Sequence, residues 1–312
     1  MAQFIRPEII RPPSESASYF LPLTSGCSNN TCTFCNYYGC KLQMRDVDEV
    51  KAEIDAVALY VKDRAVLPGI PNIIYHVIDH WWDGKKIFLQ DGDALVYPFE
   101  RLKYVLEYIR SKLPFIEQVA TYGTAQDVLR KSADELKKLK KLRLSLVYMG
   151  VESGDDEILQ QIGKGVTSNQ IIEAGKKTKA AGIRQSLTVI LGLGGNKDRA
   201  KHVEATARVL SEIDPEFAAA LTMTITPGTP LYNDWQDGKF ELISPMDSLV
   251  ELKAIVEQSN FSDCFFSSMH ASNYFSIRGK LPQEKERMIK ELASIIEKQD
   301  PSLLRPEYLR GL

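Results

Sequence analysis

Short apolar runs alternate with longer amphipathic stretches along most of the chain. The apolar runs have the lengths of buried strands, and they cover residues 19–24, 86–89, 117–122, 144–150, 186–191 and 217–225. Apolar residues at helical spacing fill the stretches between them, at residues 47–63, 99–112, near 132–141, from Thr167 onward, and at 198–213. Because strands that alternate with helices pair in parallel through right-handed crossovers, we expect six β-α units in an α/β fold.

Polar residues support several of the helix starts. Capping residues or capping-box pairs stand at Asp46, at Ser132 with Glu135, and at Thr167 with Gln170. Residues 68–84 lack such a signal, and we expect an irregular segment there. No dinucleotide-binding glycine fingerprint follows the first strand, which favours a partial (β/α)6 TIM-like barrel over an open doubly wound sheet.

The pattern also divides the chain into three parts. Residues 1–16, rich in proline and serine, are expected to form an N-terminal strap, and residues 17–230 the β/α core. Residues 231–312 are expected to form a mostly helical C-terminal extension, with helices at 245–258 and 282–299. The segment between those two helices is rich in aromatic, serine and asparagine residues, and it could cover the mouth of the barrel and exclude water.

Composition narrows the class of protein. The 312 residues are 44% hydrophobic and 26% charged, as in soluble globular proteins. A net charge of −2 gives no drive toward nucleic acid or anionic membrane, so a nucleic-acid partner is not favoured. No apolar run approaches the roughly 20 residues that span a bilayer, and no apolar leader begins the chain, so we expect a cytoplasmic protein. Five cysteines, three of them clustered, fit a reducing compartment better than a disulfide framework.

The cysteine cluster is the strongest chemical signal. Cys27, Cys32 and Cys35 have the spacing C-x4-C-x2-C in a Ser/Asn/Thr-rich loop after the first strand, which indicates a ligand set. A [4Fe–4S] cluster on three cysteines would leave one iron open, whereas a plant-type [2Fe–2S] cluster needs a fourth cysteine, either Cys40 or Cys264. A structural zinc would take Cys40 as its fourth ligand.

Three further groups of polar or glycine residues follow predicted strands. Asp91-Gly92-Asp93 comes after the strand at 86–89, Glu152-Ser153 after the fourth strand, and Gly192–Gly195 after the fifth. Each alone has an ordinary explanation as an acidic turn, a helix cap or a positive-φ loop. Because the carboxyl ends of parallel strands share one face, we expect these groups to meet the cysteine loop there.

On these motifs, with Phe34 directly before Cys35, the chain resembles the radical S-adenosylmethionine (radical SAM) superfamily over residues 17–230. It is more closely similar to a bacterial and archaeal group without an assigned reaction, through its stretches RPPSE, FLQDGDAL, YMGVESGDDEIL, TPGTPLY and HASNY. The first cysteine interval is one residue longer than in the common C-x3-C-x2-C form. The resemblance implies a [4Fe–4S] cluster on Cys27, Cys32 and Cys35, and an open iron that binds S-adenosylmethionine.

The resemblance also implies roles for the other motif residues. Asp91, Gly92 and Asp93 would accept hydrogen bonds from the amino group of S-adenosylmethionine, and Glu152 and Ser153 would contact its ribose and methionyl parts. The glycine loop, above all Gly192 and Gly194, would let the backbone approach the adenosyl part, and Phe34 would flank the adenine. Cys40 is expected not to bind the cluster, and Cys264 to be a buried thiol.

The sequence therefore predicts a radical SAM enzyme, with oxidoreductase, lyase and transferase chemistry all open. It would cleave S-adenosylmethionine reductively and act on a small-molecule or peptide substrate, with a ferredoxin or flavodoxin as electron donor. His270, Asn273 and Tyr274 are the substrate-side candidates, with ordinary structural roles as the alternative. An electron-transfer iron–sulfur protein with plant-ferredoxin-like spacing and a zinc-stabilised binding scaffold remain alternatives.

Overall fold

The computed structural model describes residues 4–9, 11–36 and 40–311. Residues 1–3 and 10 of the expected strap, residues 37–39 after the cysteine loop, and residue 312 lie outside the described residues. The chain forms two compact units. The first unit comprises residues 1–30, 38–148 and 177–184, and the second comprises residues 31–37, 149–176 and 185–312.

The first unit is built on a parallel sheet. Its strands pair in the order β1 (Tyr19–Pro22), β4 (Lys86–Gln90), β5 (Gln118–Tyr122) and β6 (Leu144–Glu152), of which β6 continues into the second unit. A short antiparallel pair, β2 (Thr24–Ser25) and β3 (Gln43–Met44), follows β1. The helical elements are η1 (Pro13–Glu15), α1 (Val47–Asp63), α2 (Asn72–His80), η2 (Ala94–Val96), α3 (Phe99–Lys112), α4 (Ala125–Arg130) and α5 (Ala133–Lys141). Apolar side chains of β1, β4 and β5 are almost completely buried, so the core lies on this sheet.

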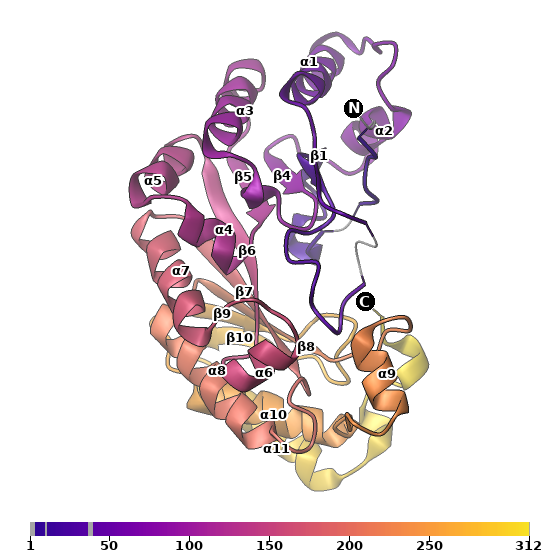
Figure 1. Cartoon of the computed structure of the whole chain (residues 1–312), viewed down its shortest axis with the longest axis vertical. Coiled ribbons are helices and arrows are strands. Elements are labelled where there is room, and N and C mark those ends of the chain that lie inside the picture. Colours follow the sequence, from indigo (N-terminus) through magenta and orange to yellow (C-terminus); the bar gives the residue numbers. More distant parts are fainter. Residues whose placement is uncertain (1–3, 10, 37–39, 312) are drawn as a thin grey trace. The chain divides into compact units, whose positions relative to one another are not determined.

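The second unit contains β7 (Arg184–Leu191), β8 (Phe217–Thr222) and β9 (Cys264–Ser267) in parallel, with β10 (Arg278–Leu281) antiparallel to β9. Its helical elements are α6 (Asp156–Gln161), α7 (Ser168–Ala180), α8 (Arg199–Ile213), α9 (Pro230–Gln236), α10 (Pro245–Gln258), α11 (Lys285–Lys298), η3 (Pro301–Leu303) and η4 (Glu307–Leu309). Helix α10 packs against both α8 and α11, as Figure 1 shows.

The predicted α/β architecture is confirmed, and each of the six expected strands is present. Helices α1, α3 and α10 have the predicted bounds. The Asp46 side chain accepts a hydrogen bond from the Asp48 N–H at 2.8 Å, and Ser132 and Glu135 form the expected capping box. These local signals therefore fix where the helices begin.

The prediction of an irregular segment at residues 68–84 was wrong in part, because residues 72–80 form helix α2, which buries Ile74, Tyr75 and Val77. The link between the two C-terminal helices contains a strand pair that was not predicted, β9 and β10, and β9 extends the sheet beside β8. In β9, Phe265 is exposed while Cys264 and Phe266 are buried, so the alternation of exposure is that of a strand. The extension is therefore helical apart from this strand pair.

The N-terminal strap is held by a buried charge cluster. Glu53 of α1 has a fully buried side chain and accepts hydrogen bonds from Arg6 at 2.7 and 3.0 Å, from Arg45 at 2.6 Å and from the Tyr19 hydroxyl at 2.6 Å. Burial alone would raise the pKa of Glu53, but the two guanidinium groups and the hydroxyl outweigh it and lower that pKa below its usual value. The strap is thus tied to helix α1 of the first unit through Arg6.

The same strap lies on one face of the first unit's sheet. The Arg11 guanidinium stacks 4.2 Å from the centre of the Phe20 ring, and the Tyr148 hydroxyl donates to Glu15 at 2.7 Å. Phe20 and Phe88 are register partners on that face, and Tyr148 packs edge-on against Phe88. Within the described residues, no helix has the length and apolar character needed to cross a bilayer.

Candidate cofactor site

The cysteine loop is anchored by its backbone on both sides of Cys32. In the second unit, the Thr33 N–H donates to the Ile162 carbonyl at 2.9 Å, and the Thr31 hydroxyl donates to the Gly163 carbonyl at 2.8 Å. Gly163 has φ +66°, and a Cβ there would lie 2.5 Å from the Thr31 carbonyl oxygen, so the contact requires glycine. The loop's second half is therefore held against the end of α6.

The three predicted cluster ligands and Phe34 are half-buried. Cys27 belongs to the first unit, and Cys32 and Cys35 belong to the second. Across residues 4–9, 11–36 and 40–311, no three His, Cys, Asp or Glu side chains are grouped closely enough to hold a metal ion. The cysteines as cluster ligands and Phe34 as an adenine neighbour stay predictions. Three thiols within nine positions are nonetheless a donor set that suits an iron–sulfur cluster.

Cys40 has a different neighbourhood from the three clustered cysteines. Its sulfur lies 3.8 Å from the Ser25 hydroxyl in the first unit. Its carbonyl oxygen lies 3.0 Å from where a Cβ on Gly26 would stand, and Gly26 has φ +89°. Cys40 therefore packs on the β2 turn. Cys264 is buried, and burial raises the pKa of its thiol to about 12, as expected for a thiol in the core.

The acidic turn after β4 binds the residues on either side of Cys27. The Gly26 N–H donates to Asp91 Oδ2 at 3.2 Å, and the Ser28 N–H donates to Asp93 Oδ2 at 3.0 Å. The Oδ1 atoms of both aspartates are buried and have no hydrogen-bond partner among the described residues. Buried polar atoms are normally satisfied, so the two oxygens are suited to a donor that arrives with a ligand. The predicted meeting of this turn with the first part of the cysteine loop is thus observed within the first unit.

The electrostatics of the acidic turn favour a cation. Burial raises the pKa of Asp91 to about 6 and that of Asp93 to about 7. The charge of Asp127 adds to the increase at Asp93. An ammonium group placed against the two Oδ1 atoms would offset this destabilisation of the charged carboxylates.

Glu152, at the end of β6, has an unusual backbone. Its φ is +64°, a left-handed conformation that is strained for a residue other than glycine. Its carboxylate folds back over Gly150, where a Cβ would come within 1.9 Å of Glu152 Oε1, and it accepts a hydrogen bond from Lys164 Nζ at 2.7 Å. The Glu152 and Lys164 side chains are only 12% and 10% exposed. Such strain at a polar residue is typical of ligand sites.

Ser153 is buried, and its hydroxyl is hydrogen-bonded within the protein. The Nε2 atom of His202 lies 3.0 Å from the Ile190 carbonyl oxygen, which can only accept, so Nε2 carries the proton. The other ring nitrogen, Nδ1, therefore accepts a hydrogen bond from the Ser153 hydroxyl at 2.9 Å. The same hydroxyl accepts from the Asp155 N–H at 3.1 Å. Burial lowers the pKa of His202 to about 4, which keeps the ring neutral. The chain Ser153–His202–Ile190 therefore joins the ends of β6 and β7, and a cofactor contact by Ser153 stays a prediction.

The glycine loop after β7 is shaped by close packing. Gly192 has φ +81°, and a Cβ there would lie 2.9 Å from Ile243. Its N–H donates to Glu251 Oε2 of α10 at 2.7 Å. The Gly194 carbonyl accepts from the Asp198 N–H at 3.2 Å, which leads the loop into α8. The loop is thus tightly defined, and its approach to an adenosyl group stays a prediction.

The three substrate-side candidates lie in one loop beside the end of β8. The Asn273 amide is buried and donates to the Ala220 and Ser268 carbonyls, at 2.8 and 2.9 Å, while its oxygen accepts from the Thr222 hydroxyl at 2.8 Å. Its polar atoms therefore bind the chain itself. His270 and Tyr274 are half-buried, so they have the more accessible side chains of the three.

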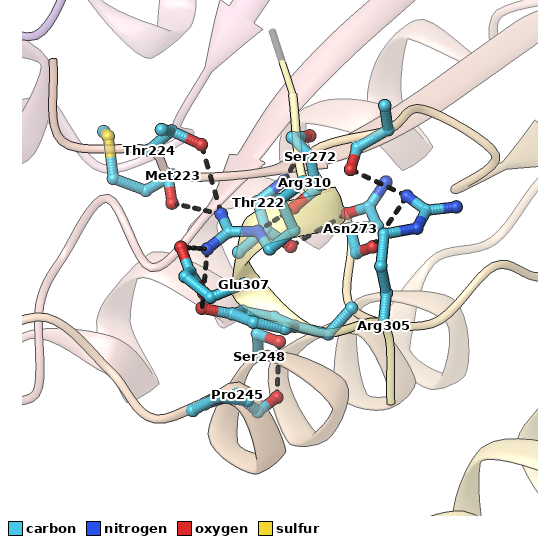
Figure 2. Close-up of polar contacts among 12 residues, drawn as sticks. Thr222, Met223, Thr224, Pro245, Ser248, Ser272, Asn273, Arg305, Glu307 and Arg310 are labelled. Atoms are coloured by element: carbon cyan, nitrogen blue, oxygen red, sulfur yellow. Dashed lines mark hydrogen bonds and ion pairs between the residues drawn. The ribbon is translucent and has the colours of Figure 1, made fainter. Parts of the chain in front are cut away.

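The C-terminal residues hold this loop in place. Arg310, with a side chain only 5% exposed, donates to the Ser272 carbonyl at 2.6 Å, to the Met223 carbonyl at 2.9 Å and to the Thr224 hydroxyl at 3.1 Å. Figure 2 shows the Arg310 guanidinium directed at Met223 and Thr224, and Arg305 bonded to the same loop. The last residues of the extension therefore tie the candidate loop to β8.

Sequence reasoning missed three residues of this region. Lys164, His202 and Glu251 each bind a predicted site residue through a side chain, but none stands in a recognisable motif. Lys164 pairs with a residue twelve positions earlier, and Glu251 with one 59 positions earlier. No local spacing rule connects such pairs, so they become visible only once the chain has folded.

Comparison with known proteins identifies the family of the chain. A model of the radical SAM superfamily matches residues 21–210. The chain is 23% identical over 258 residues to the heme chaperone HemW of Bacillus subtilis, which covers 78% of this chain and 64% of HemW. Coproporphyrinogen III oxidase (HemN) of Escherichia coli, a radical SAM enzyme, has a TM-score of 0.52 at 15% identity, over 77% of this chain and 51% of HemN.

A third relative carries a cluster in its solved structure. The radical S-adenosylmethionine methyltransferase TsrM of Kitasatospora setae, with cobalamin and a [4Fe–4S] cluster bound, has a TM-score of 0.50 at 14% identity, over 69% of this chain and 38% of TsrM. The chain spans less than two thirds of each of these three relatives. At 14–15% identity, the likeness to the solved structures shows the fold alone, which is the partial barrel predicted from the β-α repeats. Because the family match covers more than half of the 312 residues, the chain belongs to the radical SAM superfamily, whose cofactors are a [4Fe–4S] cluster and S-adenosylmethionine.

Proposed function

We propose that this protein is an enzyme that cleaves S-adenosylmethionine reductively and uses the resulting radical to abstract hydrogen from a small-molecule or peptide substrate. The observation that carries the proposal is the acidic turn. Asp91 and Asp93 bind the backbone on both sides of Cys27, and each directs a buried oxygen that no described residue satisfies. A pair of carboxylate acceptors beside a cysteine loop suits the N–H donors of the amino group of S-adenosylmethionine.

The cysteines and the acidic turn would bind the cluster and the amino group of the cofactor. Cys27, Cys32 and Cys35 would hold the cluster, because three thiolates leave one iron for the amino and carboxylate groups of the cofactor. When bound, the [4Fe–4S] cluster supplies the electron that splits S-adenosylmethionine into methionine and a 5′-deoxyadenosyl radical, which then takes a hydrogen atom from the substrate. Asp91 and Asp93 would accept hydrogen bonds from the N–H groups of the cofactor's amino group.

Other residues would orient the rest of the cofactor. Glu152, held by Lys164, presents a carboxylate that suits the ribose hydroxyls. Gly192 and Gly194 would let the adenosyl part approach the backbone. On the substrate side, His270 and Tyr274 are the half-buried candidates, and the Tyr274 hydroxyl is already hydrogen-bonded to Glu307 and Arg310. A low-potential ferredoxin or flavodoxin in a reducing cytoplasm would supply the electron, in keeping with the clustered cysteines.

The test uses the full chain, purified without oxygen and reconstituted with iron and sulfide. S-adenosylmethionine and dithionite are added without substrate, and iron per chain and 5′-deoxyadenosine are quantified. We expect about four irons per chain and slow release of 5′-deoxyadenosine from the native protein and from the Cys40→Ala control, and neither from Cys32→Ala. Two irons per chain without cleavage would favour an electron-transfer protein, and bound zinc a scaffold.

A further inference from the structure

Glu251 is a buried acid outside the part of the chain that the family model matches. It lies in α10, is 1% exposed, and accepts the Gly192 N–H through Oε2 at 2.7 Å. Its other oxygen, Oε1, is buried without a hydrogen-bond partner in the part of the chain that the structure describes. A carboxyl group in this position costs free energy, because burial penalises its charged form.

The charged groups around Glu251 do not offset that cost. The charged groups that change the pKa of Glu251 are Arg199 at the start of α8, which lowers it, and Asp247 in the same helix, which raises it. Arg199 is itself hydrogen-bonded to Asp247. Burial, the dominant effect, raises the pKa of Glu251 to about 7. A leucine of similar size would fit an apolar interior better. Among the described residues, the hydrogen-bond partner of the Glu251 carboxyl group is the Gly192 N–H of the glycine loop, which indicates that Glu251 acts on that loop.

The glycine loop needs an external constraint. Gly192 and Gly195 both have left-handed φ values, +81° and +57°, and Gly194 lies between them. Glycine-rich segments have a large conformational freedom that must be lost before they can present a fixed surface. A hydrogen bond to an ionised acceptor is among the stronger single contacts that can restrict such a segment. Glu251 supplies that contact at the first residue of the loop.

We propose that Glu251 is a positioning residue for cofactor binding, which holds the Gly192–Gly195 loop in the conformation that receives the adenosyl part of S-adenosylmethionine. This inference rests on the proposed function. It gives the C-terminal extension a part in cofactor binding: residue 251 lies beyond residue 210, where the family match ends. A purely structural role predicts instead that its loss affects stability alone.

The experiment compares three variants of the full, iron-reconstituted chain. Glu251→Leu removes the acceptor, whereas Glu251→Gln keeps an oxygen that can accept the Gly192 N–H. Glu257→Leu is the matched control, because Glu257 lies in the same helix but is 52% exposed and pairs with Lys253. Two quantities are measured: the affinity for S-adenosylmethionine by anaerobic equilibrium dialysis, and amide hydrogen exchange of the peptide containing residues 192–195 by mass spectrometry.

We expect Glu251→Leu to speed exchange in that peptide and to weaken S-adenosylmethionine binding about tenfold, the effect of losing one hydrogen bond to a charged group. Glu251→Gln should stay within about threefold of the native affinity, and Glu257→Leu should match the native protein. Native-like affinity in Glu251→Leu would overturn the inference and leave the proposed function intact. A native protein that neither binds nor cleaves S-adenosylmethionine would overturn both.

If Glu251→Leu does not fold, the native protein and Glu251→Gln are compared between pH 6 and pH 8. Other groups that titrate in this range, Asp91 and Asp93, are the same in both proteins, so the ratio of the two affinities isolates Glu251. The carboxylate is the better acceptor only when ionised, so we expect the native advantage above pH 7 to disappear by pH 6. A ratio that does not change with pH would count against the positioning role.

Discussion

Replacing Asp93 by asparagine tests the central contact of the site. The change keeps the shape of the side chain and an oxygen for the Ser28 N–H, which now lies 3.0 Å from Asp93 Oδ2. It removes the charge, and it puts an amide donor where the carboxylate presents an acceptor. The structure therefore predicts that Asp93→Asn raises the stability of the cofactor-free protein and weakens cofactor binding.

The magnitudes follow from the burial of Asp93. Its pKa rises from 3.8 to about 7 on folding, and that difference corresponds to at most about 4 kcal/mol at a pH above both values. Because the folded-state pKa is the higher one, the carboxyl group is least unfavourable at low pH, and it destabilises the fold increasingly as pH rises from about 4 to about 7. Losing a hydrogen bond between the charged carboxylate and the cofactor's amino group should cost about 1.5–3 kcal/mol, or about 10- to 150-fold in Kd.

Two measurements check this reasoning. Thermal unfolding of the cofactor-free protein at pH 6 and pH 8 should show a native protein that loses stability at the higher pH, and an Asp93→Asn variant that loses less. Calorimetry without oxygen should show S-adenosylmethionine binding weakened by at least tenfold in Asp93→Asn. Native affinity should itself fall as pH drops below 7, because the carboxylate is then protonated. Asp134→Asn, at an exposed position in the first turn of α5, is the control.

An Asp93→Asn variant with native affinity at pH 8 would remove Asp93 from the cofactor site. A variant with weaker binding but an unchanged pH dependence of stability would mean that Asp93 is already charged in the folded protein, and that no ligand is needed to offset its burial.

The remaining predictions concern the cluster, the strap and the C-terminal residues. Alanine should abolish the brown colour and bound iron of the reconstituted protein at Cys27, Cys32 or Cys35 but not at Cys40, and iron retained in the first three variants would exclude them as ligands. Glu53→Gln removes the carboxylate that pairs with the buried Arg45 and the partly buried Arg6, and urea denaturation should show a loss of about 3–5 kcal/mol, with less than 1 kcal/mol counting against a buried ion cluster. Because the folded-state pKa of Glu53 lies below the ordinary 4.5, its contribution should be complete at neutral pH and lost only as pH falls below that value. Arg310→Ala should cost about 2 kcal/mol or more and speed amide exchange in residues 270–274, and unchanged exchange there would show that the C-terminal residues do not hold the loop.

Local signals were enough to predict much of the fold. Asp46 and the apolar spacing after it define α1, because a capping side chain and a buried stripe are both properties of adjacent residues. Helix α2 was missed, since Pro71 at its N-cap and the neighbouring aromatics look like a loop in sequence. Strand β9 was missed because its partner β8 lies some 45 residues earlier in the chain, and polar neighbours conceal its alternation.

The same distinction between local and distant signals applies to the candidate site. The cysteine spacing and the acidic turn can be recognised in sequence because the residues of each motif are close together in the chain. The unsatisfied oxygens of Asp91 and Asp93 could not be predicted, since a hydrogen-bond deficit depends on everything that packs around an atom. The commitment of the Ser153 hydroxyl to His202 and of Glu251 to Gly192 likewise depends on contacts between distant segments.

The left-handed backbone of Glu152 sets backbone strain against the interactions of its side chain. Its conformation costs about 1–3 kcal/mol relative to glycine, which adopts it without strain. A glycine at residue 152 would relieve that strain, but it would also remove the carboxylate that pairs with the largely buried Lys164 ammonium, and this loss opposes the gain. Random mutagenesis selected only for heat resistance would keep such a change only where the relief of strain is the larger effect, whereas selection for turnover would reject it if Glu152 contacts the cofactor as proposed. Variants found at this position would therefore show which property had been selected.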